Sequence, residues 1–197
     1  VHPEAGDALP DVQQVAGAII TGSLSMVTDR ADWSERTAAW ARDMIAADRA
    51  LLGVCYGHQL MAHALGGTVD YHPRGREVGC HQVALAAAAK NDDFFAGMPE
   101  QFGAYLSHEQ SVLVPPPGAT VLARSDHDDH QILRYGPRAL SVQFLTEFTV
   151  PLMAACIRRR SALLASEGRD VAAMLSGIGP TLQSRRLLHA FVALAAA

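Results

Sequence analysis

A cysteine flanked by glycines, where an apolar run meets a helix-like segment, constrains this chain more than any other feature. The run ALLGV leads to Cys55, with Gly53 two positions before it and Gly57 two positions after it. Between a strand and a helix, the pattern G-x-C-x-G predicts the sharp turn of a nucleophile elbow, with a thiol in place of a hydroxyl. Because backbone N–H groups at a helix N-terminus favour thiolate over thiol, the pattern predicts a reactive cysteine.

Length and composition favour a single globular domain over residues 1–197. The chain is 49% hydrophobic and 18% charged, with a net charge of −4, which suits a substantial core. It has no long basic run and no apolar run of membrane-spanning length, so we expect neither nucleic acid nor a membrane as a partner. The arginine triplet 158–160 is interpreted as the exposed face or end of a helix. Three cysteines without C-x-x-C spacing indicate a reducing, cytoplasmic location.

The order of apolar runs predicts an α/β fold. Strands are expected at 15–20 and 50–54, with helices at 32–47 and 56–65, and this alternation predicts parallel strands with helices on the sheet faces. Helical segments are expected again from residue 150 onward. Short β-rich runs, separated by glycine- and proline-containing turns, occupy the middle of the chain at 68–71, 77–85, 104–114, 120–125, 131–135 and 140–144.

Five blocks between about residues 16 and 148 occur in an order that a known family shares: GAIITGS, GVCYGHQLMAHALGG, HPRGREVG, YLSHEQSV and ALSVQFLTEF. The series resembles the class I, or triad-type, glutamine amidotransferases, particularly the stand-alone group similar to the glutaminase domain of GMP synthase. The resemblance implies a flavodoxin-like α/β fold with a mostly parallel sheet and flanking helices. It also implies that glutamine is hydrolysed to glutamate and ammonia through a Cys55 thioester, with the ammonia delivered to a separate acceptor enzyme.

The resemblance implies roles for individual residues. Cys55 matches the nucleophile, and Glu147 matches the acid that orients the catalytic base. The backbone N–H of Tyr56 matches one oxyanion donor, and the N–H of Gly22 or Ser23 matches the other. The positions that match residues on the substrate side are Gln59, Ser107, His108 and Glu109.

The chain departs from the family pattern at the base. The family's strand ends in F-H-P-E, whereas this chain reads Phe144-Leu145-Thr146-Glu147. Leucine cannot accept or donate a proton, so we expect glutaminase turnover to be roughly several hundred-fold or more below that of an intact triad. If Glu147 is buried beside Leu145 without a cationic partner, we expect its pKa to rise, or its carboxylate to turn to water or another donor.

Another histidine could replace the missing base. Of the nine histidines, His108 on the substrate-side strand is the better candidate, and His58, three residues after Cys55, is the other. A replacement base has to come within about 3 Å of the sulfur. The competing interpretation gives both histidines a role in hydrogen bonding or packing.

A run of ionisable residues at 127–130, His-Asp-Asp-His, suggests a metal site. The run lies between two expected strands and lacks further ligands at suitable spacing, so we interpret it as a solvated turn. We expect no metal and no cofactor. The cysteines outside the elbow, Cys80 and Cys156, are interpreted as structural.

The chain begins with Val1, and its first ten residues look like the interior of a domain. Against the family pattern, a first strand, a first helix and most of a second strand should precede the strand at 15–20. A sheet without a central strand exposes hydrogen-bonding edges and apolar side chains. We therefore expect either a longer parent chain or self-association as a homo-oligomer.

Three functions agree with these observations. The first is a glutamine amidotransferase with impaired glutaminase activity. The second is a thiol hydrolase similar to a γ-glutamyl peptidase, with a relocated base. The third is a non-catalytic glutamine-binding or regulatory module.

Overall fold

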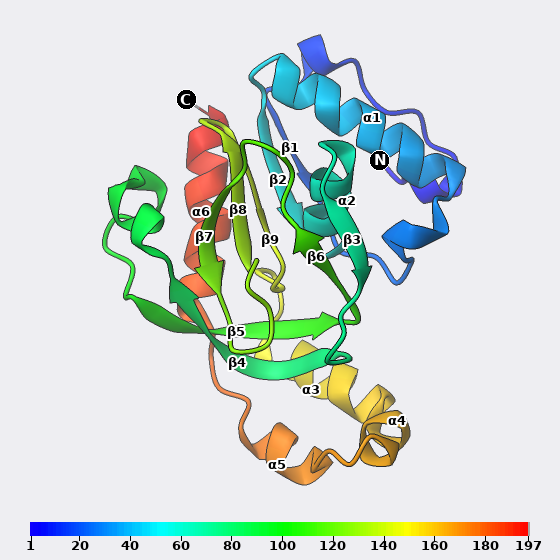
Figure 1. Cartoon of the computed structure of the whole chain (residues 1–197), viewed down its shortest axis with the longest axis vertical. Coiled ribbons are helices and arrows are strands. Elements are labelled where there is room, and N and C mark those ends of the chain that lie inside the picture. The colour runs from blue at the N-terminus through cyan, green and yellow to red at the C-terminus, as the bar shows by residue number, and fades with distance from the viewer. Residues whose placement is uncertain (197) are drawn as a thin grey trace.

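A computed structural model describes residues 1–196 and has a seven-stranded sheet at its centre (Figure 1). The sheet has the strand order β1-β2-β9-β8-β7-β4-β5. A second sheet, with the strands β3 and β6, lies beside it. The strands are β1 (Gly17–Ile20), β2 (Ala50–Val54), β3 (Thr68–Tyr71), β4 (Glu77–Leu85), β5 (Gln101–His108), β6 (Gln110–Val114), β7 (Thr120–Arg124), β8 (Ile132–Gly136) and β9 (Ala139–Val142).

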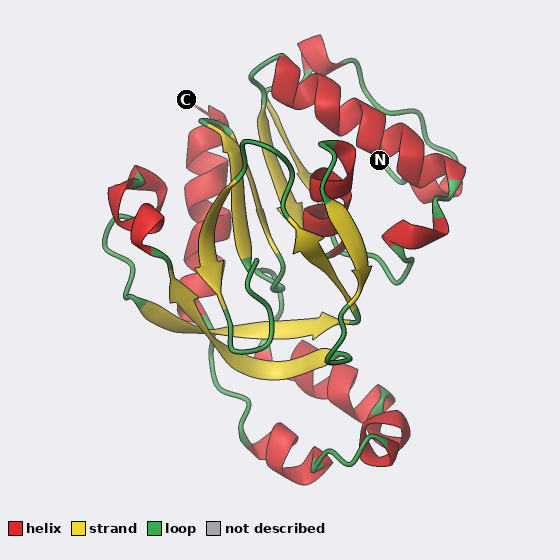
Figure 2. Ribbon diagram, in the orientation of Figure 1, coloured by secondary structure: helices red, strands yellow, loops and turns green. Residues whose placement is uncertain are grey.

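Helices pack on both faces of the large sheet, as Figure 2 shows. The α-helices are α1 (Asp32–Ala46), α2 (Tyr56–Ala64), α3 (Val150–Arg159), α4 (Ser161–Ser166), α5 (Val171–Ser176) and α6 (Leu182–Ala196). The short 3-10 helices are Pro3–Ala5, Val12–Gln14, Val27–Asp29, Ala87–Asn91 and Asp93–Phe95. Within residues 1–196, none of the helices is long and apolar enough to cross a bilayer.

The predicted α/β class is confirmed. The parallel strand pairs involve β2, the strand that leads to Cys55. Strand β2 pairs in parallel with β1 on one side and with β9 on the other. From β9 onward the pairs β9–β8, β8–β7, β7–β4 and β4–β5 are antiparallel. The long strands β4 and β5 run across the end of the others, toward α3, α4 and α5 (Figure 1).

The central strand β2 is buried along its whole length because helices cover both of its faces. Leu51 packs with Met44 of α1 and Met61 of α2 on one face. Leu52 packs in the cluster that contains Leu187 of α6 on the other face. A continuously apolar strand sequence is expected for a parallel strand that is buried on both sides.

One expected strand is divided in two. The run at 104–114 was predicted as continuous, but β5 ends at His108 and β6 begins at Gln110. Strand β5 pairs with β4 in the large sheet, whereas β6 pairs with β3 in the small one. The chain changes sheets at Glu109, where neither glycine nor proline marks a break.

Candidate active site

The turn predicted at the cysteine is present. Cys55 lies between β2 and α2, at the N-terminal cap of the helix, with φ 53° and ψ −102°. A non-glycine residue in this region costs on the order of 1–3 kcal/mol. The flanking glycines allow close backbone contacts: a Cβ on Gly57 would lie 2.1 Å from the carbonyl oxygen of Ile20. A Cβ on Gly53 would lie 2.5 Å from the carbonyl oxygen of Gly57.

The expected lowering of the thiol pKa is wrong. Burial, followed by the negative charge of Glu147, raises the pKa of the Cys55 thiol to about 12. The backbone N–H of Tyr56 and the guanidinium of Arg160 lower it, but they do not offset burial. At pH 7 such a thiol is ionised in roughly one molecule in 10⁵. The helix N-terminus alone therefore does not produce a thiolate.

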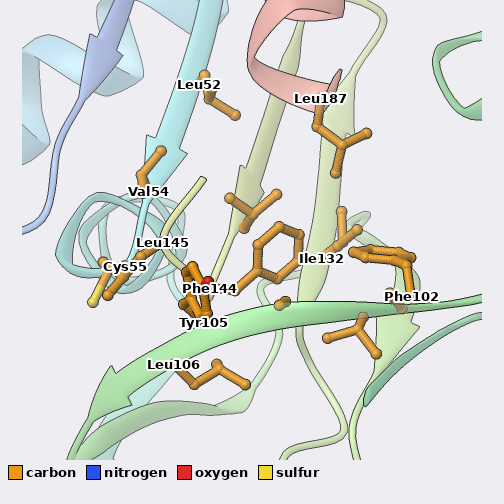
Figure 3. Packing of buried hydrophobic residues seen from close by; sticks show 14 of the residues in the cluster. Leu52, Val54, Cys55, Phe102, Tyr105, Leu106, Ile132, Phe144, Leu145 and Leu187 are labelled. Atoms are coloured by element: carbon orange, nitrogen blue, oxygen red, sulfur yellow. The ribbon is translucent and has the colours of Figure 1, made fainter. Parts of the chain in front are cut away.

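Leu145 lies beside Cys55, as Figure 3 shows. A Cβ added to Gly22 would lie 3.6 Å from Cβ of Cys55 and 3.8 Å from Cδ2 of Leu145. The backbone N–H of Leu145 donates to the carbonyl oxygen of Tyr105 at 2.8 Å. Leu145 and Cys55 belong to the same apolar cluster, with 5% and 7% of their surfaces exposed. The side chain that this segment places beside Cys55 is therefore aliphatic.

Glu147 is exposed to solvent, so the condition of burial does not apply. Its Oε2 accepts a hydrogen bond from the Thr146 hydroxyl at 3.3 Å. No cationic side chain among residues 1–196 forms an ion pair with it. The carboxylate therefore faces water, with Thr146 as its hydrogen-bond donor.

The residues expected to form the oxyanion hole surround the sulfur. Gly22, Ser23 and Tyr56 line the same cavity as Cys55. Tyr56 is the first residue of α2, and a hydrogen bond from its backbone N–H lowers the pKa of the Cys55 thiol. The arrangement does not distinguish Gly22 from Ser23 as the second donor.

Two cavities meet at Cys55. The smaller has a volume of about 120 Å³, and the larger about 1240 Å³. The smaller cavity brings together the four residues predicted on the substrate side, Gln59, Ser107, His108 and Glu109. The larger cavity follows the free edge of β1 and reaches α3. The residues that line both cavities are Ser23, Leu24, Cys55, Tyr56, Ser107 and Arg160.

His108 is not available as a replacement base. Its Nδ1–H donates to the carbonyl oxygen of Gln110 at 2.9 Å, and its Nε2–H donates to the Glu77 carboxylate at 3.1 Å. Burial raises the pKa of Glu77, but the hydrogen bond and electrostatic interaction with His108, together with the hydrogen bond from Ser125, outweigh burial and lower it. Both ring nitrogens of His108 are therefore engaged in hydrogen bonds within the protein.

His58 is not a replacement base either. Its Nδ1 hydrogen-bonds to Oγ of Ser141 at 2.7 Å, and it lines neither cavity. Burial lowers the pKa of His58 to about 3, so the ring is neutral at pH 7. Both histidines therefore have the hydrogen-bonding and packing roles of the competing interpretation.

The run at 127–130 forms a turn, as predicted, but one of its acids is buried. Asp128 is 2% exposed, and its Oδ1 accepts the backbone N–H of His130 at 2.9 Å. The ring of His130 donates through Nδ1 to the carbonyl oxygen of Val112 at 2.6 Å. Among residues 1–196, no three His, Cys, Asp or Glu side chains form a group that would hold a metal ion.

The sequence interpretation missed Arg160. Arg158 and Arg159 are exposed near the end of α3, as expected for the triplet, but Arg160 lines both cavities. Its Nη1–H donates to Sγ of Cys156 at 2.9 Å. Cys156 also lies 3.4 Å from Oγ of Ser107. Only the break between α3 and α4 turns the third arginine inward, and the helical pattern of the sequence does not indicate that break.

A cysteine at a sharp strand–helix turn, at the end of parallel strands and beside a small cavity, is the arrangement of a nucleophile elbow in an α/β fold. The family model described as "Glutamine amidotransferase class-I" matches residues 5–154. The chain therefore belongs to the class I glutamine amidotransferase family.

Curated relatives include γ-glutamyl peptidases and GMP synthases. The chain is 27% identical over 151 residues to "Gamma-glutamyl peptidase 5" of Arabidopsis thaliana, covering 76% of this chain and 60% of that one. It is 32% identical over 142 residues to "GMP synthase [glutamine-hydrolyzing]" of Aeropyrum pernix, covering 72% and 25%. It is 29% identical over 148 residues to a glutamine-hydrolysing GMP synthase subunit of Methanopyrus kandleri, covering 75% and 74%. The chain thus spans between a quarter and three quarters of the length of these relatives.

Solved structures share the fold. A glutamine amidotransferase from Thermotoga maritima has a TM-score of 0.77 at 18% identity, over 99% of this chain and 84% of that one. A glutamine amidotransferase from Methylobacillus flagellatus has a TM-score of 0.76 at 21% identity, over 98% and 80%.

Proposed function

We propose that the chain binds the side-chain amide of glutamine, or of a related γ-glutamyl compound, at Cys55 and hydrolyses it far more slowly than an intact triad would. The observation that carries the proposal is the position of Leu145 beside Cys55, where the family pattern has its base. The smaller cavity supports binding, because it gathers Gln59, Ser107 and Glu109 next to the sulfur.

The missing proton carrier affects two steps of the reaction. In the attack, the Cys55 sulfur bonds to the amide carbon, and its proton goes to water because Leu145 cannot accept it. In the breakdown, the nitrogen takes a proton from water, since Leu145 cannot supply one, and leaves as ammonia. A water molecule then hydrolyses the Cys55 thioester to the carboxylic acid and regenerates the thiol. General acid–base catalysis is worth about 10²- to 10⁴-fold per step. We therefore expect turnover roughly several hundred-fold or more below that of an intact site.

The part of the site that stabilises negative charge supports slow residual chemistry. The N–H of Tyr56, with that of Gly22 or Ser23, would donate to the oxyanion formed when the sulfur attacks the amide carbon. Oxyanion donors and positioning retain part of the catalytic power when a triad member is removed. Residual hydrolysis, if measured, should therefore depend on Cys55.

A separate ammonia-accepting enzyme is the proposed partner if hydrolysis occurs. One relative, from Methanopyrus kandleri, is named as a subunit of GMP synthase, and it matches this chain over 75% of the chain's length. Ammonia released at Cys55 would then serve an acceptor that is not part of residues 1–197.

Hydrolysis of γ-glutamyl peptides is the second candidate function. The observation that favours it is the cavity of about 1240 Å³ that adjoins Cys55, because ammonia as a leaving group needs no such room. The relative from Arabidopsis thaliana is named as a γ-glutamyl peptidase. A γ-glutamyl dipeptide that is cleaved faster than glutamine would favour this function.

The proposal is tested by restoring the base. We expect Leu145→His to raise ammonia release from glutamine by about 10²-fold or more, because it returns a proton carrier to the sulfur. Leu145→Gln is the matched control, since it is polar but cannot act as a base at neutral pH. Cys55→Ser in the Leu145→His background should abolish the gain.

Two results would contradict the proposal. One is glutamine hydrolysis by the unaltered chain at a rate that Leu145→His does not increase. The other is a calorimetric measurement in which neither glutamine nor γ-glutamyl dipeptides bind. This result would mean that the cavity at Cys55 is not a binding site for these compounds.

A further inference from the structure

Arg160 brings an uncompensated positive charge to the junction of the two cavities. The residue separates α3 from α4, and its half-buried side chain lines both cavities together with Cys55. Its one hydrogen bond to a side chain is from Nη1–H to Sγ of Cys156, at 2.9 Å. Among residues 1–196, no carboxylate pairs with its guanidinium.

The other arginine of the smaller cavity differs from Arg160. Arg76 donates to Glu109 at 2.6 Å and to Glu167 at 2.7 Å. Its charge is therefore neutralised twice within the protein. The smaller cavity thus has a compensated charge cluster on one part of its wall and a free cation, Arg160, on another.

The chemistry of a guanidinium indicates what this cation would bind. Arginine offers five N–H donors in a planar fork that matches a carboxylate, whereas a cysteine sulfur is a weak acceptor that uses only one of them. A partly desolvated cation without a counter-charge is unfavourable, and an anionic ligand relieves the cost. The position therefore favours a carboxylate that enters the cavity.

A γ-glutamyl compound carries such a carboxylate at the end opposite its side-chain amide. When its side-chain amide lies at the sulfur, its α-carboxylate lies at the far end of the same short chain. We propose that Arg160 determines specificity by binding the α-carboxylate of the ligand whose amide lies at Cys55. This inference rests on the proposed function and names the group by which that site selects its ligand.

A role of Arg160 in activating the thiol is the competing explanation. Its charge does lower the pKa of Cys55, but burial and the charge of Glu147 outweigh it, and the thiol pKa remains raised. The two roles can be distinguished by comparing ligands with and without an α-carboxylate. A residue that binds the α-carboxylate affects only ligands that have one, whereas a residue that acts on the thiol or the fold affects all ligands alike.

The test compares L-glutamine with L-glutaminamide, which keeps the side-chain amide and the amino group but lacks the carboxylate. Binding of each to the full chain is measured by isothermal titration calorimetry. We expect Arg160→Gln to weaken glutamine binding by about ten- to a hundred-fold and to change glutaminamide binding by less than about two-fold. Arg158→Gln, an exposed arginine of the same triplet that lines neither cavity, is the matched control and should change neither.

Each outcome decides the inference. A selective loss of glutamine binding in Arg160→Gln, partly restored in Arg160→Lys, supports it. Equal losses for both ligands, or no loss for either, overturn it while the proposed function stands, provided that the unaltered chain binds glutamine. If the unaltered chain binds neither ligand, the inference and the proposed function both fail.

Discussion

The two sides of the Cys55 site differ in what they retain. On the elbow side, β2, α2 and the glycines around Cys55 hold a backbone that only a strand–helix turn of this kind adopts. On the other side, the segment after β9 keeps an acid at Glu147 but places Leu145 next to the sulfur. The sharp turn at Cys55 is thus present, and a leucine rather than a proton carrier lies beside it.

The difference shows that positioning and proton transfer depend on separate physical requirements. The elbow is fixed by close packing, since a side chain at Gly57 would collide with the backbone of β1. Such packing stabilises the fold whether or not catalysis occurs. A catalytic base contributes nothing comparable, and leucine packs well in the apolar cluster that it joins. The fold therefore tolerates the loss of the base far better than a change at the elbow.

The elbow side should not tolerate even one methyl group. We expect Gly57→Ala to destabilise the chain by about 3 kcal/mol or more, because its Cβ would lie 2.1 Å from the carbonyl oxygen of Ile20. Urea unfolding measures the change. Gly136→Ala is the control, since a Cβ there meets nothing within 4 Å. Equal stability of the two variants would show that the close approach at the elbow is not rigid.

The wall of the smaller cavity should depend on the buried Glu77 carboxylate. We expect Glu77→Ala to cost about 3–5 kcal/mol, because it removes the buried carboxylate that His108, Ser125 and Gln131 share and leaves their polar groups unpaired. Glu100→Gln, which removes an exposed acid that pairs with Lys90, is the control and should leave urea unfolding unchanged. A small effect of Glu77→Ala would mean that water replaces the carboxylate as the partner of these side chains.

Acid should lower the free energy of unfolding, because His58 of α2, the helix that follows Cys55, is buried and neutral. The pKa of His58 is about 3 in the folded chain and about 6.5 when unfolded, so the unfolded state binds an extra proton between these values. Stability should therefore fall as the pH falls from about 6.5, by up to about 1.4 kcal/mol per pH unit. Glu77, whose pKa is lowered in the folded chain, adds loss in the same direction below about pH 4.5.

The contribution of His58 is isolated by substitution. We expect His58→Gln to reduce the slope of unfolding free energy against pH between pH 6.5 and 5, whereas exposed His189→Gln should leave the slope unchanged. Urea unfolding at several pH values gives both slopes. An unaltered slope in His58→Gln would contradict the neutral, buried state of this ring.

The smallest expected effect concerns the acid that faces water. We expect Glu147→Gln to lower the pKa of Cys55 by about one pH unit or less, because the carboxylate raises that pKa and burial remains. Alkylation of Cys55 against pH measures the shift, with Glu100→Gln as the control. A larger fall would mean that charge, not burial, keeps the thiol protonated.

Much of the fold could be predicted from the sequence because its signals are local. The glycines around Cys55 and the apolar run before it indicate the elbow directly, and β2 and α2 follow from them. The change of sheets at Glu109 could not be predicted, because it depends on which strands β5 and β6 pair with. Pairing partners distant in sequence leave no mark on the residues between the strands.

Which residues gather at the cavities around Cys55 could be predicted from the sequence, but their electrostatics could not. Leu145, at which the sequence departs from the family pattern, lies beside Cys55. The raised thiol pKa could not be foreseen, since it depends on burial by residues from several elements rather than on the helix N-terminus alone. The inward turn of Arg160 likewise depends on a break between two short helices that the sequence does not mark.

The central claim is that the thiol of Cys55 stays protonated at neutral pH, because burial raises its pKa and Leu145 beside it cannot accept the proton. The most direct measurement is the rate of Cys55 alkylation by iodoacetamide against pH, followed on the Cys55 peptide by mass spectrometry. The account predicts a rate that still rises above pH 9, the ordinary value for a cysteine. A plateau with a midpoint near or below about pH 7, as an activated thiolate would give, contradicts it.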